Sequence, residues 1–398
     1  MKIAIVLPRF PYPLEKGDKL RAYHQIVALS RMGHSLCLFC LSHERVSEAQ
    51  MAALRPHCET IQVARLGRVA SLLRAAASML ACRSVQVGYW RSRRARSMYA
   101  RFETATRPDV VYSQMVRTIT MVAGSKLPKA MDYQDALSKN MERRMAATPR
   151  GPRRFLYHFE FKMLRNCEYK AFDIFDALAI ISEPDSKAIP RQYGRPIAVI
   201  PNGVDFSYFK PQEKREGCDV LFCGNMQYQP NVLAAQCLAR EVMPIVWQSM
   251  PHATLRLAGA TPTLAVRCLA GSRVEVTGTV PDMRPHYASA KVFAAPMQTG
   301  SGLQNKLLEA MAMEVPCVTS TIANAALGAM PGQEVLIGDN PQEMAQHIVQ
   351  LLGSQQQRDI QADNARRFVH SRYSWERCGQ QLAELLEEAV RQHNRQHA

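Results

Sequence analysis

Apolar and polar residues follow one another along the chain in short strand-like blocks and longer helix-like blocks. Residues 2–7 form a brief apolar run, residues 8–18 a loop with three prolines, and residues 19–32 carry apolar side chains at helical spacing. Alternating strands and helices of this kind predict a parallel sheet covered by helices on both faces. In this first half, strands are expected at residues 2–7, 35–41, 60–64, 109–113, 177–181 and 197–200.

The same alternation starts again after residue 210 and continues to a helix that begins near residue 375. Strands are expected at residues 219–223, 253–257, 274–276, 292–295, 317–320 and 335–337, and a helix at 231–248. The pattern predicts an α/β protein with two Rossmann-like, doubly wound domains, 1–201 and 202–374, and a C-terminal helix, 375–398, that packs back toward the first domain. Such sheets bind ligands at the carboxyl ends of their strands, so two of them facing a central cleft suit an enzyme that joins two substrates.

Charge divides the chain in the same way. The 398 residues carry a net charge of +16, yet residues 1–210 hold 34 Lys+Arg against 17 Asp+Glu, and residues 211–398 hold 16 against 17. Nine arginines and no carboxylate lie between Glu59 and Glu103. Such an excess indicates anionic partners: nucleic acid, a membrane or a phosphorylated substrate.

The Arg-rich stretch, residues 65–101, favours an anionic membrane surface among these partners. Tyr89 and Trp90 stand beside the cations of RSRRAR, as in interfacial anchors, and residues 71–82 are helix-prone and apolar. No zinc finger, RNA-binding sheet motif or helix-turn-helix pattern is found, so nucleic acid is not expected. The alternative is a solvated basic face without a partner.

The cysteines indicate a reducing compartment. The chain has 11, scattered and mostly in apolar runs; Cys37 and Cys40 have CxxC spacing, but in a strand they point to opposite faces, and no second CxxC follows. A zinc site is therefore not expected. No apolar run reaches the ~18 residues of a membrane span. The apolar run within the first ten residues is too short for a signal peptide. The expected location is the cytoplasm, at most peripheral to the inner face of the plasma membrane.

The segment 296–309 carries the most specific chemistry. A strand ends, a loop with Gly300 and Gly302 follows, and a helix begins near Gln304. Exposed amides at the helix start, together with Lys306, are suited to bind a phosphate, and Glu309 to accept hydrogen bonds from sugar hydroxyls. The alternative is an ordinary strand–loop–helix corner; the segment matches neither Walker A nor the dinucleotide fingerprint.

Three further places carry candidate groups. Gly224 follows the first strand of the second domain and permits close approach of a ligand, while Asn231 is suited to cap the next helix. Gly17 precedes a helix in the first domain. Asp132 and Asp135 follow a short strand, where paired carboxylates bind hydroxyls or act as a base, although Asp135 or Ser138 is as well suited to cap a helix.

Together these segments resemble a retaining glycosyltransferase of family 4, with GT-B architecture, and in particular a bacterial subgroup associated with exopolysaccharide gene systems. The resemblance spans nearly the whole chain. Besides the N-terminal strand and Gly17 loop, the matching segments are IISEPDS (180–186), IPNGVDFSYF (200–209), VLFCGNMQYQPN (220–231), LRLAGATP (255–262), VEVTGTVPDM (274–283), APMQTGSGLQNKLLEAMAMEVPCVTS (295–320) and YSW (373–375).

The resemblance implies that the second domain binds a nucleotide-diphosphate sugar, which is transferred to a glycan or lipid-linked acceptor. Val280 then lies near the base, the amides of residues 302–304 hold the pyrophosphate, Glu309 binds the ribose, and Gly17 lies near the donor phosphates. The residues expected at the donor are Gly17, Gly224, Asn225, Val280, Gly302, Leu303, Gln304, Asn305 and Glu309.

The chain departs from the family pattern in three places. Ser301 stands where the first Glu of the family's pair is expected, no Arg or Lys follows the GN loop in residues 226–231, and Asp132 or Asp135 replaces a His. Lys306 is then expected to stabilise the leaving diphosphate without a metal or cofactor, and an Asp to orient the acceptor. The alternatives are a GT-B nucleotide-sugar epimerase and a non-catalytic basic scaffold with a degenerate glycosyltransferase fold; a dehydrogenase is disfavoured because no GxGxxG follows the first strand.

Overall fold

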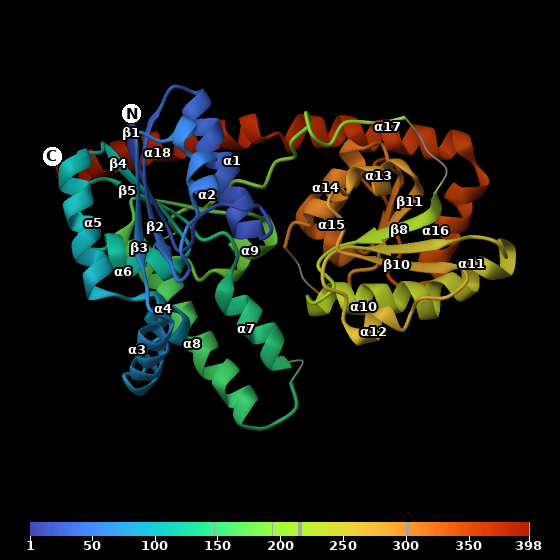
Figure 1. Cartoon of the computed structure of the whole chain (residues 1–398), viewed down its shortest axis with the longest axis horizontal. Coiled ribbons are helices and arrows are strands. Elements are labelled where there is room, and N and C mark those ends of the chain that lie inside the picture. Colours follow the sequence, from blue (N-terminus) through green and yellow to red (C-terminus); the bar gives the residue numbers. More distant parts are fainter. Residues whose placement is uncertain (147, 193, 214–216, 300–301, 398) are drawn as a thin grey trace. The chain divides into compact units, whose positions relative to one another are not determined.

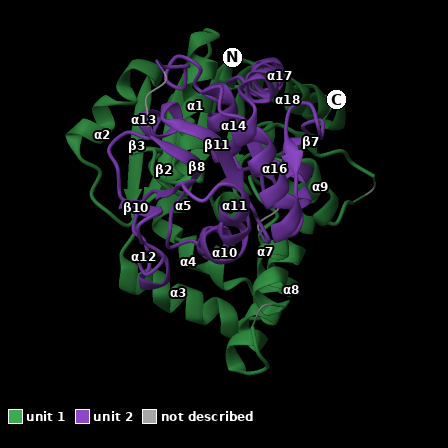
Figure 2. Cartoon of the chain, turned by 90° about the vertical axis from the view of Figure 1, so that its right-hand side faces the viewer, with its two compact units in different colours: residues 1–201, 375–398 green, residues 202–374 purple. Residues whose placement is uncertain are grey.

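The computed structural model describes residues 1–146, 148–192, 194–213, 217–299 and 302–397. The chain forms two compact units: unit 1 comprises Met1–Pro201 and Trp375–Ala398, and unit 2 comprises Asn202–Ser374 (Figures 1 and 2). Unit 1 carries 36 Lys+Arg against 20 Asp+Glu, whereas unit 2 carries 14 of each. The whole net charge of the chain therefore belongs to unit 1.

Unit 1 is built on a seven-stranded parallel sheet with the order β3-β2-β1-β4-β5-β6-β7. The strands are β1 (Lys2–Leu7), β2 (Ser35–Ser42), β3 (Thr60–Arg65), β4 (Val110–Gln114), β5 (Lys129–Asp132), β6 (Ala177–Ile180) and β7 (Ala198–Val199). The helical segments are α1 (Gly17–Arg31), α2 (Glu48–Ala52), η1 (Arg55–His57), α3 (Arg68–Leu80), α4 (Val85–Trp90), α5 (Arg93–Thr106), η2 (Val116–Thr118), α6 (Ile119–Val122), α7 (Leu137–Ala146), α8 (Pro152–Ile174), α9 (Glu183–Ala188) and α18 (Trp375–His397).

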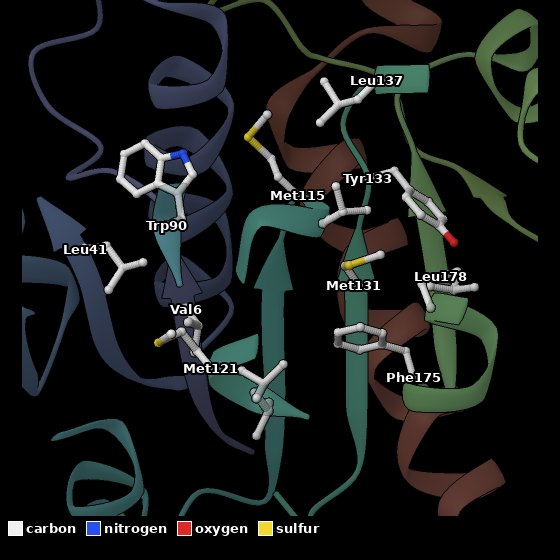
Figure 3. Packing of buried hydrophobic residues seen from close by; sticks show 14 of the residues in the cluster. Val6, Leu41, Trp90, Met115, Met121, Met131, Tyr133, Leu137, Phe175 and Leu178 are labelled. Carbon is white, nitrogen blue, oxygen red and sulfur yellow. The ribbon is translucent and has the colours of Figure 1, made fainter. Parts of the chain in front are cut away.

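Two apolar clusters cover the two faces of this sheet. One, shown in Figure 3, packs strand residues such as Val6 and Met131 against Trp90 and Phe175. The other packs the opposite face against α1 and α18. Cys37 belongs to the first cluster and Cys40 to the second, so the two thiols do point to opposite faces of the sheet.

Helix α18 closes the second cluster through close contacts with α1. A Cβ at Gly379 would lie 2.5 Å from the Cβ of Ala28, so the two helices touch where neither has a larger side chain. The rings of His24 and Trp375 stack at a centroid distance of 4.6 Å. The last helix is therefore a structural part of unit 1.

Unit 2 is also built on a parallel sheet, with six strands in the order β10-β9-β8-β11-β12-β13. They are β8 (Cys218–Cys223), β9 (Leu255–Ala258), β10 (Val274–Gly278), β11 (Ala290–Ala295), β12 (Cys317–Thr319) and β13 (Leu336–Ile337). The helical segments are α10 (Gln229–Cys237), η3 (Leu238–Val242), α11 (Met243–Ser249), α12 (Leu264–Arg267), α13 (Arg284–Ala288), α14 (Asn305–Ala312), α15 (Thr321–Leu327), α16 (Pro341–Gly353) and α17 (Gln355–Arg372).

Both sheets have the Rossmann strand order, which confirms the predicted fold class of two doubly wound α/β domains. In each sheet the strand order reverses beside the first strand, between β1 and β4 in unit 1 and between β8 and β11 in unit 2. The loops that leave those strands diverge, and the space outside their carboxyl ends is where such sheets bind ligands.

Candidate functional site

Lys306, Asn231 and Gly224 meet where the strand order of unit 2 reverses. Lys306 lies in the first turn of α14, and its Nζ donates a hydrogen bond to Asn231 Oδ1 at 2.5 Å. The same ammonium lies 4.6 Å from the centroid of the Phe222 ring at the end of β8. The ammonium of Lys306 thus connects α14, which follows β11, to the residues that follow β8.

Gly224 must be glycine for this arrangement. Its φ of +154° is in the region that L side chains rarely adopt, and a Cβ there would lie 2.6 Å from Asn231 Nδ2 and 3.2 Å from Lys306 Nζ. The bare backbone leaves room beside the ammonium. A ligand that approaches the end of β8 therefore meets the positive charge at close range.

Asn231 does not cap α10, contrary to the sequence-based expectation. The helix begins earlier, at Gln229, with Tyr228 in the cap position. The Asn231 side chain instead donates from Nδ2 to the carbonyl of Asn225 at 2.9 Å while its Oδ1 accepts from Lys306. One amide therefore fixes both the glycine loop and the cation.

Lys306 carries a charge that its surroundings do not neutralise. Among the described residues its Nζ has only the Asn231 oxygen and, at 3.9 Å, the sulfur of Met297 as hydrogen-bond partners, and it has no carboxylate partner. Burial lowers the pKa of Lys306 to about 8, and the carboxylate of Glu309 opposes that shift only in part. A partly desolvated ammonium of this kind gains most from an incoming anion such as a phosphate.

Glu309 lies one turn further along α14 and is held by a tyrosine. The hydroxyl of Tyr287 lies 2.8 Å from Glu309 Oε2 and 3.0 Å from the sulfur of Cys223. Burial raises the pKa of Glu309, opposed by this hydrogen bond and by Lys306. Tyr287, on α13, was missed by sequence reasoning, because nothing in its local pattern indicates the helix it would touch.

The other predicted donor residues of unit 2 lie in neighbouring loops. Asn225 Oδ1 accepts from the Gln227 amide at 2.9 Å and from the Thr261 hydroxyl at 3.3 Å. The Thr261 amide in turn donates to the hydroxyl of Thr279 at 3.4 Å, next to Val280. The loops after β8, β9 and β10 are therefore linked at the carboxyl edge of the sheet.

The start of α14 is bounded by the remaining predicted residues. Gln304 is the N-cap residue, makes no side-chain cap, and donates from its side chain to the Gly302 carbonyl at 2.8 Å. Leu303 is buried, and Asn305 Oδ1 accepts from the Asn202 side chain at 3.1 Å. Gly300 and Ser301 lie outside the described residues.

Asp132 in unit 1 is part of a buried ion pair. Its Oδ2 lies 2.7 Å from Arg21 Nε, and both side chains are 1% exposed. Arg21 also donates to the carbonyls of Ile200 and Pro201, at 2.8 and 3.1 Å, and Tyr112 OH lies 3.1 Å from the same carboxylate oxygen. A carboxylate so enclosed is placed to hold the strand ends together rather than to touch an acceptor.

Asp135, three residues further on, is half-buried and differently placed. Burial raises its pKa to about 6, and the carboxylates of Asp185, Asp132 and Asp18 add to the shift while Arg21 opposes it. Among the described residues no hydrogen-bond partner of the Asp135 side chain is found. Of the two predicted carboxylates, Asp135 is the less buried and the less tightly held.

Gly17 is the first residue of α1 and has no atom within 4 Å of the position a Cβ would take. It belongs to unit 1, whereas the other predicted donor residues belong to unit 2. Its role near the donor phosphates stays a prediction. No helix of the described residues is long and apolar enough to cross a membrane.

The sequence of unit 2 matches a known family. Residues 217–354 match the family model described as glycosyl transferases group 1. Over 363 residues the chain is 24% identical to an uncharacterised 44.6 kDa protein in the cps region of Klebsiella pneumoniae, covering 87% of this chain and 90% of that protein. Over 184 residues it is 28% identical to a GDP-mannose-dependent monoacylated alpha-(1-6)-phosphatidylinositol monomannoside mannosyltransferase of Corynebacterium glutamicum, covering 44% and 45%.

Solved structures match the whole chain in fold. A sucrose-phosphate synthase from Thermosynechococcus elongatus superposes with a TM-score of 0.66 at 14% identity, covering 98% of this chain and 99% of that one. Anabaena HepE in complex with UDP and glucose gives 0.65 at 17%, covering 97% and 99%, and WaaG, a glycosyltransferase involved in lipopolysaccharide biosynthesis, gives 0.66 at 13%, covering 96% and 99%. The chain has the GT-B fold, and the match of residues 217–354 to the model of glycosyl transferases group 1 supports a glycosyltransferase.

Proposed function

We propose that the protein is a retaining glycosyltransferase of family 4 that moves a sugar from a nucleotide-diphosphate sugar to a glycan or lipid-linked acceptor. Its setting would be bacterial exopolysaccharide or cell-surface polysaccharide biosynthesis. The observation that carries the proposal is Lys306, whose unneutralised ammonium lies beside Gly224 at the reversal of strand order in unit 2. The match to a cps-region protein and to UDP-binding structures of the same fold supports it.

The chemistry follows from where negative charge develops. As the bond between the anomeric carbon and the phosphate oxygen breaks, charge accumulates on the departing diphosphate, and Lys306 with the amides at the start of α14 stabilises it. The acceptor hydroxyl forms the new bond to the anomeric carbon on the same face, and its proton passes to the departing phosphate oxygen. Asp135 orients the acceptor. The positive charge comes from the protein itself, so the proposal includes no metal or cofactor.

Removal of the ammonium tests the donor site directly. We expect Lys306→Ala to weaken UDP or GDP binding roughly 10- to 150-fold, because a hydrogen bond to a charged group contributes about 1.5–3 kcal/mol. Lys210→Ala, which removes an exposed lysine of the same unit, is the matched control and should bind as the wild type does.

Isothermal titration of both variants measures the effect. Wild-type affinity in Lys306→Ala, or a wild-type protein that binds neither nucleotide, would overturn the assignment and favour a non-catalytic scaffold. Nucleotide release from a donor sugar that depends on an added acceptor separates the transferase from an epimerase.

Unit 1 carries a surface that fits the proposed membrane partner. The large apolar side chains of α3 point outward: Val69, Leu72, Leu73 and Leu80 are 72, 62, 66 and 88% exposed. Its buried residues are small, namely Ser71, Ala75 and Ser78. This helix is turned the opposite way to an ordinary surface helix, which buries its large apolar side chains.

Helix α3 packs against α4 through the face that carries its small residues. A Cβ at Gly88 of α4 would lie 2.1 Å from Ser78 Oγ and 3.2 Å from the carbonyl oxygen of Arg74. The backbones of α3 and α4 therefore approach through residues that have little or no side chain. Figures 1 and 2 show α3 and the α7–α8 hairpin projecting from the same end of unit 1.

The cations lie beside this apolar stripe. A hollow of about 650 Å³ between α3 and the start of α5 is lined by five arginines, namely Arg74, Arg83, Arg91, Arg93 and Arg94. Apolar side chains at the headgroup boundary, with arginines beside lipid phosphates, are what an anionic bilayer binds. We call residues 68–96 the α3–α5 surface and propose that it docks on the inner face of the plasma membrane, where a lipid-linked acceptor resides.

A further inference from the structure

A second, smaller hollow in unit 1 is separate from the donor site and shares only Trp90 with the α3–α5 surface. It has a volume of about 120 Å³ and lies among the loop after β1, the loop after β2 and the start of α1, with Trp90 of α4 at one side. Its basic residues are Arg9, Lys16, Lys19, His43 and Arg45. We call this hollow the unit 1 basic pocket.

Positive charge in this pocket exceeds what the chain neutralises. Among the described residues, the side chains of Lys16 and Arg45 have no hydrogen bond or ion pair, and Lys19 reaches only the Tyr12 carbonyl at 3.4 Å. The one carboxylate that lines the pocket, Glu44, pairs instead with Arg68 at 3.1 Å. Within the described part of the chain, Arg9 is the one cation of the pocket with a carboxylate partner.

The carboxylate of Asp18 does not neutralise the remaining positive charge of the pocket. Arg9 Nη1 lies 2.9 Å from Asp18 Oδ2, so this pair is close to neutral, and the charges of Lys16, Lys19 and Arg45 remain. Three cations gathered around one hollow repel each other, and an anion bound between them removes that repulsion.

The walls of the pocket include buried aromatic side chains. Trp90 is 6% and Phe10 4% exposed, and His43 Nε2 lies 3.0 Å from the hydroxyl of Ser71. The His43 ring packs on Tyr89 and Trp90 at centroid distances of 4.8 and 4.7 Å. Aromatic walls with flexible cations at the rim suit a sugar-like ligand that bears a charged group.

We propose that the unit 1 basic pocket binds an anionic group, phosphate or carboxylate, of the sugar acceptor. The inference rests on the proposed function, which needs an acceptor in addition to the donor. The pocket lies at the carboxyl ends of β1 and β2, the edge at which such sheets bind ligands.

The pocket also adjoins the α3–α5 surface. Trp90 lines the pocket, and the next residue, Arg91, lines the arginine-rich hollow. An acceptor in which an anionic group links a sugar to a lipid would place that group in the unit 1 basic pocket and its lipid at the α3–α5 surface. The specificity of the proposed transferase would then include an acceptor charge that a neutral glycan lacks.

The test uses the full chain and three probes: glucose 1-phosphate, glucuronate and glucose. The chain carries Lys306→Ala throughout, so that a phosphate bound at the donor site does not contribute. Lys16→Ala with Arg45→Ala removes two exposed cations of the pocket. Lys126→Ala with Lys162→Ala removes two exposed cations of unit 1 that do not line it, so net charge falls equally.

We expect at least one anionic probe to bind more tightly than glucose in isothermal titrations at low salt. The Lys16/Arg45 variant should weaken that binding at least tenfold, and the Lys126/Lys162 variant by less than twofold. Preference for glucose 1-phosphate identifies phosphate as the acceptor group, and preference for glucuronate identifies a carboxylate.

Two results overturn the inference: glucose binding as tightly as both anions, or the two double variants weakening binding equally. The donor proposal fails on a separate readout, the nucleotide titration of the chain with an intact Lys306. A thermal unfolding scan of each double variant confirms that the pocket, and not the fold, has changed.

Discussion

The outward leucines of α3 give the sharpest expectation about the partner of unit 1. Replacing Leu72, Leu73 and Leu80 by Gln removes three side chains that are 62–88% exposed in the free protein. Burying a whole leucine side chain contributes about 1.5–3 kcal/mol, so transfer of the exposed part into a bilayer contributes about 1–2.5 kcal/mol for each.

The headgroup boundary is only partly apolar, so the lower end of this range applies. Three leucines then contribute about 3 kcal/mol, and the triple variant should bind vesicles roughly a hundredfold more weakly. Folding should change little, because substitutions of exposed residues usually alter the free energy of unfolding by about 0.5 kcal/mol or less.

Cosedimentation with vesicles of phosphatidylglycerol and phosphatidylcholine, at low and high salt, measures the partition. The matched control replaces Leu264, Met330 and Ile360 of unit 2 by Gln; these are 77, 53 and 55% exposed and lie outside the α3–α5 surface. The control should sediment as the wild type does. High salt should weaken binding, because the arginine contribution is electrostatic.

Equal sedimentation of the leucine triple variant and the wild type would refute the reasoning about α3. Binding to neutral phosphatidylcholine vesicles as strong as to anionic ones would refute the role of the arginines. A wild-type protein that stays in the supernatant with anionic vesicles at low salt would refute the membrane partner altogether.

Two other expectations follow from buried charges. Burial lowers the pKa of Lys306 to about 8, so in the free protein the ammonium loses its proton as pH rises through 8. Nucleoside diphosphate binding should begin to weaken as pH approaches 8 and should fall by up to tenfold per pH unit above it. Nucleotide titrations from pH 7 to 10 measure the change in affinity. The Lys306→Arg variant keeps its positive charge, so its affinity should not depend on pH in this range. The same slope in that variant would contradict the role of Lys306 in binding the diphosphate. Asp132→Ala leaves Arg21 buried without its carboxylate and should lower the free energy of unfolding by about 3–5 kcal/mol, measured by urea unfolding. Glu183→Ala, which breaks the exposed pair with Lys187 at 3.8 Å, is the control; equal small effects in both variants would show that the Arg21 pair contributes little to stability.

The sequence predicted those features that depend on local spacing. Apolar runs of strand length placed most strands within one or two residues, because a buried parallel strand is apolar on both faces. The positions of Gly224 after β8 and of Lys306 at the start of α14 were also predicted, because a strand, a loop and a helix follow one another at each place; their roles stay predictions.

Features that depend on which distant segments meet were not predicted. Asn231 was expected to cap α10, yet it binds Lys306, 75 residues away, and Arg21 meets Asp132 across 111 residues. The pattern of α3 shows an amphipathic helix, and its composition does not tell which face is inside. The exposed leucines and the packing of Ser78 against Gly88 show that the small residues face inward.

The continuity of unit 2 along the chain has a consequence for how donor specificity can change. Unit 2 is a single uninterrupted segment, Asn202–Ser374, and its ends are paired by a β-bridge between Val204 and Ser374, whereas unit 1 needs both the start and the end of the chain. Related chains can therefore exchange this segment as one cassette, with two adjacent junctions and no change to α18 or its contact with α1. If unit 2 binds the donor as proposed, exchange of this one segment would change the nucleotide-sugar preference, while the proposed acceptor and membrane sites of unit 1 stay unchanged.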